Sequence, residues 1–196
     1  LLWPPPEREF WPDALARVPM IYLAEVYWDR EYQLQQQGFD YTYDKRLYDR
    51  LLHEPAGAVR GHLSAGLDFQ DHLVRFLENH DEPRAAATFA PEMHRAAAVV
   101  TFLSPGLRFF HQGQREGKRV RIPPHLGRGP AEVPDASIAT FYDTLLACLR
   151  DQAFRDGRAP VIPGPRASAT AVYRQGLTLW RMELAKAAAL LLQELV

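Results

Sequence analysis

The chain has 196 residues, of which 47 % are hydrophobic, 11 % aromatic and 24 % charged, and its formal net charge is −1. This composition is typical of one globular domain with a core and excludes a disordered or fibrous chain. The near-zero charge gives no electrostatic ground for binding nucleic acid or an anionic membrane.

The first half of the chain predicts two strands and a helix. The apolar run MIYLAEVYW is typical of a strand buried on both faces, and we place that strand at residues 20–25. An aromatic-rich run predicts a second strand at 38–43. A helix is expected at 44–55, because its leucines share one face, Asp44 can cap its start and Pro55 ends it.

The second half continues this alternation of strands and helices. A short apolar run predicts a third strand at 72–79, and a helix that starts at Pro91 is expected over 91–106. A fourth strand is expected at 106–110, followed by an amphipathic helix at 135–151. Strands and helices that alternate at about 30-residue spacing are typical of βαβ units, so the sequence predicts a parallel sheet.

Polar side chains follow three of the predicted strands. Glu25 ends the first strand, and Asn79, His80 and Asp81 end the third. His111 follows the fourth strand. Functional sites of parallel sheets lie at the carboxyl ends of the strands, so we expect these side chains to meet at one rim.

Two carboxylates of this predicted rim could act as a pair. Glu25 lies inside an apolar run, so we expect it to be partly desolvated and to hold its proton more tightly, as a general acid near neutral pH requires. Asp81 comes two βα units later and should face Glu25 from a non-adjacent strand. Two carboxylates around a glycosidic bond are the usual machinery of sugar cleavage, and His80 can donate hydrogen bonds to sugar hydroxyls.

A simpler interpretation assigns these side chains no chemistry. Glu25 would then be a solvated residue just past a strand end. Asn79, His80 and Asp81 would only cap the helix that follows, since Asp is a favoured N-cap residue. The chain would be a generic α/β domain, and this alternative predicts that Glu25 and Asp81 point apart.

Motifs for other chemistries are absent from the sequence. There is no HExxH and no paired Cys/His spacing, so we expect no metal. The segment GQREGKRVR is not a P-loop, no G-x-S-x-G occurs, and Cys148 has no evident partner for nucleophilic catalysis. We therefore expect no cofactor.

Three observations bear on the compartment. Cys148 is the only cysteine, which fits a reducing environment. The N-terminal LLWPPPEREF has neither the basic flank nor the apolar core of a signal peptide. The longest fully apolar stretch near the C-terminus, 187–192, is too short to span a bilayer. We expect a cytoplasmic protein without membrane contact.

Four segments resemble the α-amylase family, glycoside hydrolase family 13, in order and spacing. MIYLAEVYWD resembles the family's fifth-strand motif, with Glu25 as the general acid/base, and GFDYTYDKRLYDRL fits the sixth strand and its helix. FLENHDEPR resembles the seventh-strand motif, with Asp81 as the transition-state stabiliser. SPGLRFFHQGQREGKR resembles the eighth strand and the loop after it, which contains Gln114 and lines the substrate cleft.

The resemblance implies an α/β fold, a partial (β/α)8 TIM barrel made of about its last four βα units. Residues 1–152 would form this carboxyl-terminal half of the barrel, and residues 153–196 read as a linker and a C-terminal helical tail. The family's β-sandwich would be missing. Four strands cannot close a barrel, so we expect exposed sheet edges that self-associate or need a partner.

The resemblance also implies retaining cleavage or transfer at the α-glucosidic bonds of an α-glucan or maltooligosaccharide. Glu25 would protonate the leaving oxygen, while His80 and Asp81 would hold the sugar hydroxyls and favour the oxocarbenium-like ring. The predicted substrate-binding residues are Asn79, His80, Tyr27, Trp28 and Gln114.

The family's nucleophile has no counterpart in this sequence. A retaining mechanism needs a second carboxylate about 5 Å from the acid, which the family carries on the fourth strand. The sole aspartate before Glu25 is Asp13, in a segment that predicts a helix. We expect the chain alone to be inactive. The alternative to an enzyme is a truncated relative that keeps weak carbohydrate binding.

Overall fold

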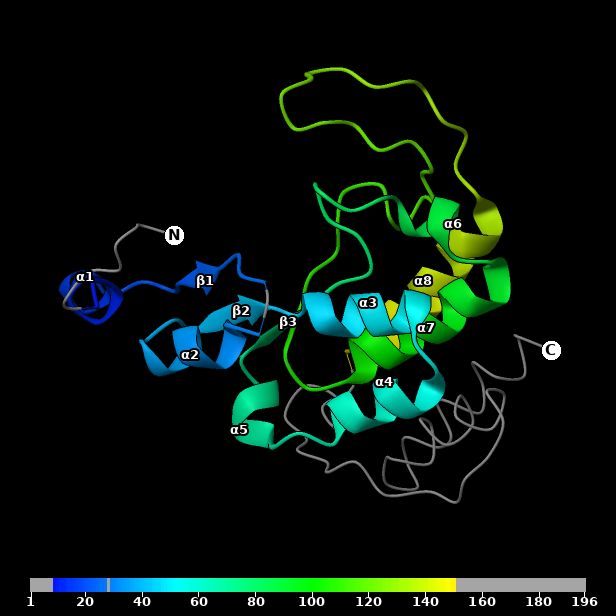
Figure 1. Cartoon of the computed structure of the whole chain (residues 1–196). Coiled ribbons are helices and arrows are strands. Elements are labelled where there is room, and N and C mark those ends of the chain that lie inside the picture. The colour runs from blue at the N-terminus through cyan, green and yellow to red at the C-terminus, as the bar shows by residue number, and fades with distance from the viewer. Residues whose placement is uncertain (1–8, 28, 151–196) are drawn as a thin grey trace.

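The structure, a computed structural model, describes residues 9–27 and 29–150 (Figure 1). Trp28 and the predicted tail at 153–196 lie outside the described residues. Within the described part of the chain, no helix is long and apolar enough to cross a membrane.

Four short strands form one parallel sheet in the order β1-β2-β3-β4, as the sequence predicted. The strands are β1 (Leu23–Ala24), β2 (Tyr41–Tyr43), β3 (Leu73–Arg75) and β4 (Leu107–Arg108). Every neighbouring pair is parallel. Each strand is shorter than its predicted range, and the architecture is a mixed α/β fold consistent with part of a TIM-type barrel.

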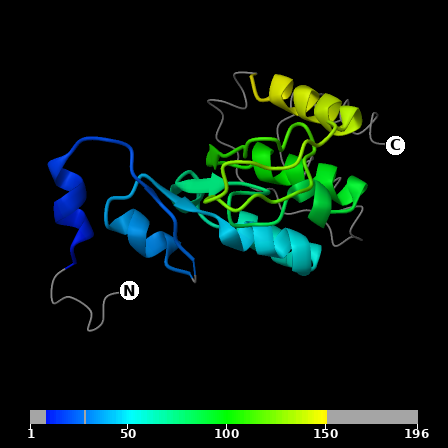
Figure 2. The ribbon, with the colours of Figure 1, turned by 90° about the horizontal axis from the view of Figure 1, so that it is seen from above.

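Helices connect and cover the strands. The described helices are α1 (Trp11–Arg17), α2 (Glu31–Gln36), α3 (Lys45–His53), α4 (Ala56–Leu63), α5 (Leu67–Gln70), α6 (Ala85–Thr88), α7 (Pro91–Leu103) and α8 (Ala136–Cys148). In Figure 2, α3 and α8 lie on either side of α7, while α1 lies at the far end of the sheet, beyond β1. The predictions at 44–55, 91–106 and 135–151 correspond to α3, α7 and α8.

Local capping explains where two of these helices begin. The Asp44 carboxylate accepts a hydrogen bond from the Leu47 N–H at 3.1 Å and caps α3. The Asp135 carboxylate caps α8 by accepting from the N–H groups of Ser137 and Ile138. Both caps satisfy backbone donors that the first helical turn leaves unpaired.

The first strand is not buried on both faces, which corrects the sequence prediction. Met20 is 62 % exposed, Ile21 75 % and Leu23 39 %. In the described residues β1 pairs with β2 alone, so it is an edge strand. By contrast, all three residues of β3 are fully buried, because β3 has a strand on each side and helices over its faces.

The main core lies between β3, α7 and α8. It contains Val74 and Phe76, together with Phe102 of α7 and Tyr142 of α8. The Phe102 ring stacks on Phe110 with a centroid separation of 4.0 Å. The sheet is thereby anchored to the helical layer on the side of β3 and β4.

A buried ionic network links β2, β3 and the helices beneath them. The Arg75 guanidinium pairs with the Asp44 carboxylate through Nη1, and Nη2 donates to Gln70 Oε1 at 2.9 Å. His62 Nε2 lies 3.1 Å from Asp44 Oδ2. Burial by itself would raise the pKa of Asp44, but the charge of Arg75 and the contact with His62 lower it below its ordinary value.

His94 predicts a pH dependence of stability. Burial, together with Arg95, lowers the pKa of His94 to about 4. The unfolded chain, with its ordinary value near 6.5, binds this proton more tightly, so the contribution of His94 to the free energy of unfolding should fall by about 2–3 kcal/mol as pH drops to about 4.5. Urea titrations of the unsubstituted protein and of His94→Gln at pH 8 and pH 4.5 measure this contribution. Acid should destabilise His94→Gln less than the unsubstituted protein, by this amount.

The exposed His53 provides the matched control for this pH dependence. His53→Gln should show the same change in stability between pH 8 and pH 4.5 as the unsubstituted protein. An equal change in His94→Gln and in the unsubstituted protein would show that His94 does not contribute to the pH dependence.

Candidate functional site

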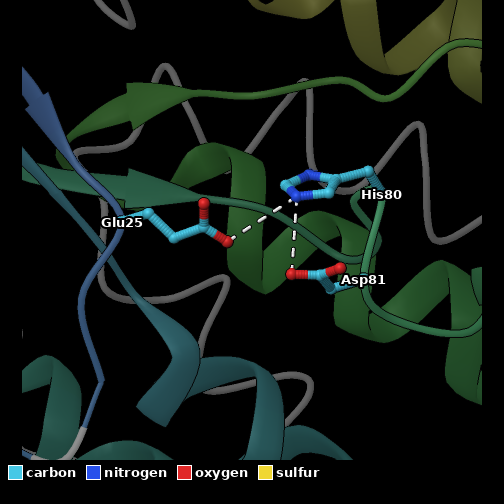
Figure 3. A group of neighbouring side chains, drawn as sticks. All are labelled: Glu25, His80 and Asp81. Carbon is cyan, nitrogen blue, oxygen red and sulfur yellow. Dashed lines mark ion pairs between the residues drawn. The ribbon is translucent and has the colours of Figure 1, made fainter. Parts of the chain in front are cut away.

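Glu25, His80 and Asp81 come together at the carboxyl ends of the strands, and we call them the rim trio. Glu25 directly follows β1, whereas His80 and Asp81 lie in the loop after β3. His80 Nε2 lies 3.7 Å from Glu25 Oε1 and 3.4 Å from Asp81 Oδ2, so the imidazole sits between the two carboxylates (Figure 3). One oxygen or nitrogen atom from each residue lies within 4.8 Å of the others.

This geometry confirms that the two acids share one rim. The strand β2 lies between β1 and β3, so the carboxylates come from non-adjacent strands as predicted. The alternative in which Glu25 and Asp81 point apart is wrong.

The rim trio is solvated, which corrects the expectation of a desolvated Glu25. The side chains of Glu25, His80 and Asp81 are 42 %, 41 % and 49 % exposed. The reason is the edge position of β1, where Met20, Ile21 and Leu23 of the same apolar run are exposed.

Asn79 shapes the loop that presents the other two motif residues. Its side chain is buried, and Oδ1 accepts hydrogen bonds from the N–H groups of Asp81 at 2.9 Å and Glu82 at 2.8 Å. The following helix α6 is held instead by Glu78, whose Oε2 accepts from the Ala85 N–H at 2.7 Å. The interpretation of Asn79, His80 and Asp81 as mere helix caps is therefore wrong.

Two tyrosines border the rim trio. The Tyr27 hydroxyl donates to Glu25 Oε1 at 3.0 Å, and burial together with this bond raises the pKa of Tyr27 above its ordinary value. Burial also raises the pKa of Tyr43, with further contributions from the charges of Glu25 and Asp81. Tyr43 was missed by the sequence analysis, although its place at the end of β2 is a signal that could have identified it.

Gln114 has a different environment from the one expected of a substrate-binding residue. It is 1 % exposed, and its Nε2 donates to the Tyr142 hydroxyl at 2.9 Å. Its Oε1 accepts from the His111 N–H at 3.3 Å. These bonds tie the loop after β4 to α8, so the structure gives Gln114 a place inside the fold, and its contact with substrate stays a prediction.

A buried acid that the sequence analysis missed supports the loop after β3. Glu78 is 1 % exposed, and its Oε1 lies 3.0 Å from Arg84 Nη2 and 3.6 Å from His111 Nδ1. Burial raises the pKa of Glu78 to about 7, against the opposing effects of the Ala85 N–H and the Arg84 charge. We call Glu78, Arg84 and His111 the inner hub.

The inner hub connects the loop after β3 to the loop after β4. Arg84 Nη1 lies 2.8 Å from His111 Nδ1, and Nη2 donates to the Gln112 carbonyl at 2.9 Å. Burial, the Arg84 charge and the His80 charge lower the pKa of His111, in that order. The inner hub thus supports, from the protein interior, the loop that carries His80 and Asp81 at the surface.

Arg121 brings a positive charge to the rim trio from the long segment between β4 and α8. Its Nε donates to the His80 carbonyl at 3.2 Å, and its Nη2 lies 3.9 Å from Asp81 Oδ1. No motif in the sequence marked this arginine. Its contacts depend on how the segment folds back over the rim.

The rim trio could also offer ligands to a divalent cation, since it combines one imidazole with two carboxylates. The absence of a metal, which the sequence predicted, stays a prediction. For sugar chemistry, the close approach of Glu25 and Asp81 places two acids on the scale of a glycosidic bond.

Comparison with known proteins supports the fold. Solved structures that share it include the following two. The chain matches the cyclic α-maltosyl-(1→6)-maltose hydrolase from Arthrobacter globiformis, solved with maltose, at 19 % identity and a TM-score of 0.65, over 79 % of this chain and 40 % of that one. It also matches a noncanonic maltogenic α-amylase, AmyB from Thermotoga neapolitana, at 23 % identity and a TM-score of 0.58, over 77 % of this chain and 38 % of that one.

The chain therefore spans about two-fifths of the length of these structures. No family model and no curated protein sequence matches it. At this level of identity the likeness establishes the fold, which agrees with the resemblance drawn from the sequence motifs. A closed eight-stranded barrel is not shown.

Proposed function

We propose that this chain forms the carboxyl-terminal half of an α-amylase-type barrel and that an α-glucan or maltooligosaccharide binds at its rim trio. The observation that carries the proposal is the meeting of Glu25, His80 and Asp81 from β1 and β3 within 4.8 Å. The fold shared with the two hydrolases supports it.

Each member of the trio has a role in this proposal. Glu25, oriented by the Tyr27 hydroxyl, donates the proton to the leaving oxygen. His80 and Asp81 accept and donate hydrogen bonds at the sugar hydroxyls, and Asp81 stabilises positive charge on the ring. Asn79 acts through the loop it shapes, while Tyr27 and Trp28 supply aromatic surface for the sugar.

We further propose that the described chain binds sugar without turning it over. A retaining mechanism uses a carboxylate nucleophile, an acid/base and, in this family resemblance, a third stabilising acid, and the rim trio accounts for the last two. Loss of an essential catalytic group typically lowers the rate by about 10³–10⁶-fold.

A second candidate is catalysis by the Glu25 and Asp81 pair itself. Retaining glycosidases place their two carboxyl groups about 5–5.5 Å apart, and these two acids approach within a similar distance. In that case Asp81 would be the nucleophile.

Hydrolysis of 4-nitrophenyl α-maltoside by the full chain separates these candidates. We expect no release of 4-nitrophenol above that of a Glu25→Gln variant. Release that disappears in both Glu25→Gln and Asp81→Asn would establish the second candidate instead.

Calorimetry with maltoheptaose tests the proposed binding. We expect saturable binding that weakens at least tenfold in His80→Ala, because the imidazole bridges both acids, and stays unchanged in His53→Ala. Tenfold corresponds to about 1.4 kcal/mol, the loss of one or two charge-assisted hydrogen bonds. Absence of saturable binding, or equal affinity in His80→Ala, would contradict the proposal.

The exposed sheet edges lead to one more proposal about partners. In the described residues β1 and β4 each pair with a single strand, and both Leu23 and Leu107 are more than a third exposed. Unpaired strand edges are templates for pairing with another chain. We propose that these edges contact a second copy or a complementary polypeptide, which sedimentation velocity over a concentration series would reveal.

A further inference from the structure

A cavity of about 390 Å³ lies away from the rim trio. It is bounded by α6, the start of α7 and the start of α8, and none of Glu25, His80 and Asp81 lines it. Its size is at the lower end of the range for small-molecule sites, which run from about 300 to 1,000 Å³. Nothing in the proposed glucan chemistry uses it.

Two arginines line this cavity without a described ion pair to any carboxylate. Arg95 Nη2 donates to the Ser137 hydroxyl, and Arg119 Nη1 donates to the Ala86 carbonyl. A guanidinium has five N–H donors, so each arginine keeps most of its donors available to a ligand. Arginine is well suited to carboxylate and phosphate groups because its donors form a planar fork.

The other ionisable groups that line the cavity leave its net charge positive. Asp135 is the one carboxylate, and its Oδ1 is engaged by the N–H groups of Ser137 and Ile138 at the start of α8. His94 is held neutral near pH 7 because burial lowers its pKa to about 4. The start of α7, which has no side-chain cap, adds the partial positive charge of a helix N-terminus.

Apart from the hydroxyls of Thr88 and Ser137, the rest of the lining is apolar. Phe89, Pro91, Ile138 and Phe141 supply hydrocarbon surface, and small alanines of α6 leave room beside it. A purely inorganic anion would leave this surface unused. A neutral apolar molecule would leave both guanidinium groups without an anionic partner.

We propose that this cavity binds a small organic anion, a carboxylate or phosphate monoester carried on a compact apolar body, with its charged group between Arg95 and Arg119. The site is independent of the glucan-binding rim.

Titration calorimetry on the full chain with phenyl phosphate and benzoate tests the proposal. We expect at least one of these probes to bind with one-to-one stoichiometry, and its affinity to fall at least tenfold in Arg95→Gln and in Arg119→Gln. Arg128→Gln, an exposed arginine outside the cavity, and Glu25→Gln should leave that affinity unchanged.

Further probes test the two parts of the ligand. Benzyl alcohol should bind at least tenfold more weakly than the organic anion because it lacks the charge. Inorganic phosphate should also bind at least tenfold more weakly, because it lacks the apolar body. Circular dichroism melts verify that each variant folds, and Arg95→Lys, which keeps the charge, should retain part of the affinity if Arg95→Gln does not fold.

Three results would overturn this assignment. The first is that neither anion binds saturably up to 10 mM. The second is that Arg95→Gln or Arg119→Gln leaves the affinity within twofold of the unsubstituted protein. The third is that benzyl alcohol or inorganic phosphate binds as tightly as the organic anion. Because maltoheptaose is absent from the assay, failure here leaves the rim proposal untouched, and failure at the rim leaves this one untouched.

Discussion

Replacing Asp44 by alanine is expected to lower the free energy of unfolding by about 3–5 kcal/mol, the range for breaking a buried ion pair from one side. The substitution leaves the guanidinium of Arg75, which is fully buried, without its carboxylate. It also removes the α3 cap that accepts from the Leu47 N–H, a loss of about 1 kcal/mol. Domains of this size are stable by only about 5–15 kcal/mol, so the variant should be close to unfolding at 37 °C.

Urea denaturation followed by circular dichroism at pH 7 measures this effect. Asp44→Asn keeps an acceptor for the Leu47 N–H and should lose less than Asp44→Ala. The double variant Asp44→Ala/Arg75→Met removes both buried charges and should recover much of the loss. The exposed Asp143, which pairs with Arg115 on the surface, is the control, and Asp143→Ala should change stability by less than about 1 kcal/mol.

One outcome would contradict this explanation. If the double variant is no more stable than Asp44→Ala, the loss comes from packing or capping and the charge of Arg75 has no part in it. The pH dependence gives a second check. Because the folded pKa of Asp44 is lowered, its contribution is present above pH about 4 and is lost as the pH falls through the folded value.

Replacing Glu78 by alanine is the second large effect that we expect. At pH 8, above its pKa of about 7, Glu78 is mainly ionised and pairs with Arg84 in the interior. The substitution strands the Arg84 charge and leaves the Ala85 N–H without its acceptor, so the free energy of unfolding should fall by about 3 kcal/mol or more. The loop that carries His80 and Asp81 also loses the buried ion pair with Arg84 that supports it.

Two measurements at pH 8 test the role of the inner hub. Urea denaturation gives the loss of stability, and calorimetry with maltoheptaose gives the affinity, which should fall at least tenfold in Glu78→Ala. Glu78→Gln keeps an oxygen for the Ala85 N–H and should retain more stability than Glu78→Ala. Glu116→Ala, at a partly exposed acid after β4, is the control. Unchanged affinity in a folded Glu78→Ala would show that the rim does not depend on the hub.

The pH dependence of Glu78 has the opposite sign to that of Asp44. Burial raises the folded pKa above the ordinary value of 4.5, so the folded state holds the proton more tightly between pH 4.5 and pH 7. The contribution of Glu78 to stability therefore falls as the pH rises through this window. His94 acts against it in part of the same range, which is why each variant has to be compared with its own control.

Much of the fold could be predicted because its signals are local. The apolar runs, the helix caps at Asp44 and Asp135 and the alternation of elements all depend on neighbours in sequence. The rim followed from these signals, because in a parallel sheet all carboxyl ends meet at one edge whatever the details of packing. The pairing of Glu25 with Asp81 could thus be anticipated from order and spacing.

The environment of each side chain could not be predicted in the same way. Whether Glu25 is desolvated depends on β1 having a neighbour on one side or on two, and the exposed apolar residues that precede it in the same run mark an edge strand. Asn79 and Gln114 have the residue types of ligand-binding groups, but their hydrogen bonds are made inside the protein. The residue type determines which hydrogen bonds a side chain can make, and its burial determines which of them it makes.

By itself the sequence determined the parallel α/β architecture and the two acids of the rim, because periodicity, capping and strand order are carried by residues close along the chain. Only the tertiary structure decided the inner hub, the pairing of Asp44 with Arg75, and the cavity between α6, α7 and α8. These features join segments far apart in sequence, and a buried charge acquires its partner, and its pKa, from whichever distant segment the packing brings beside it.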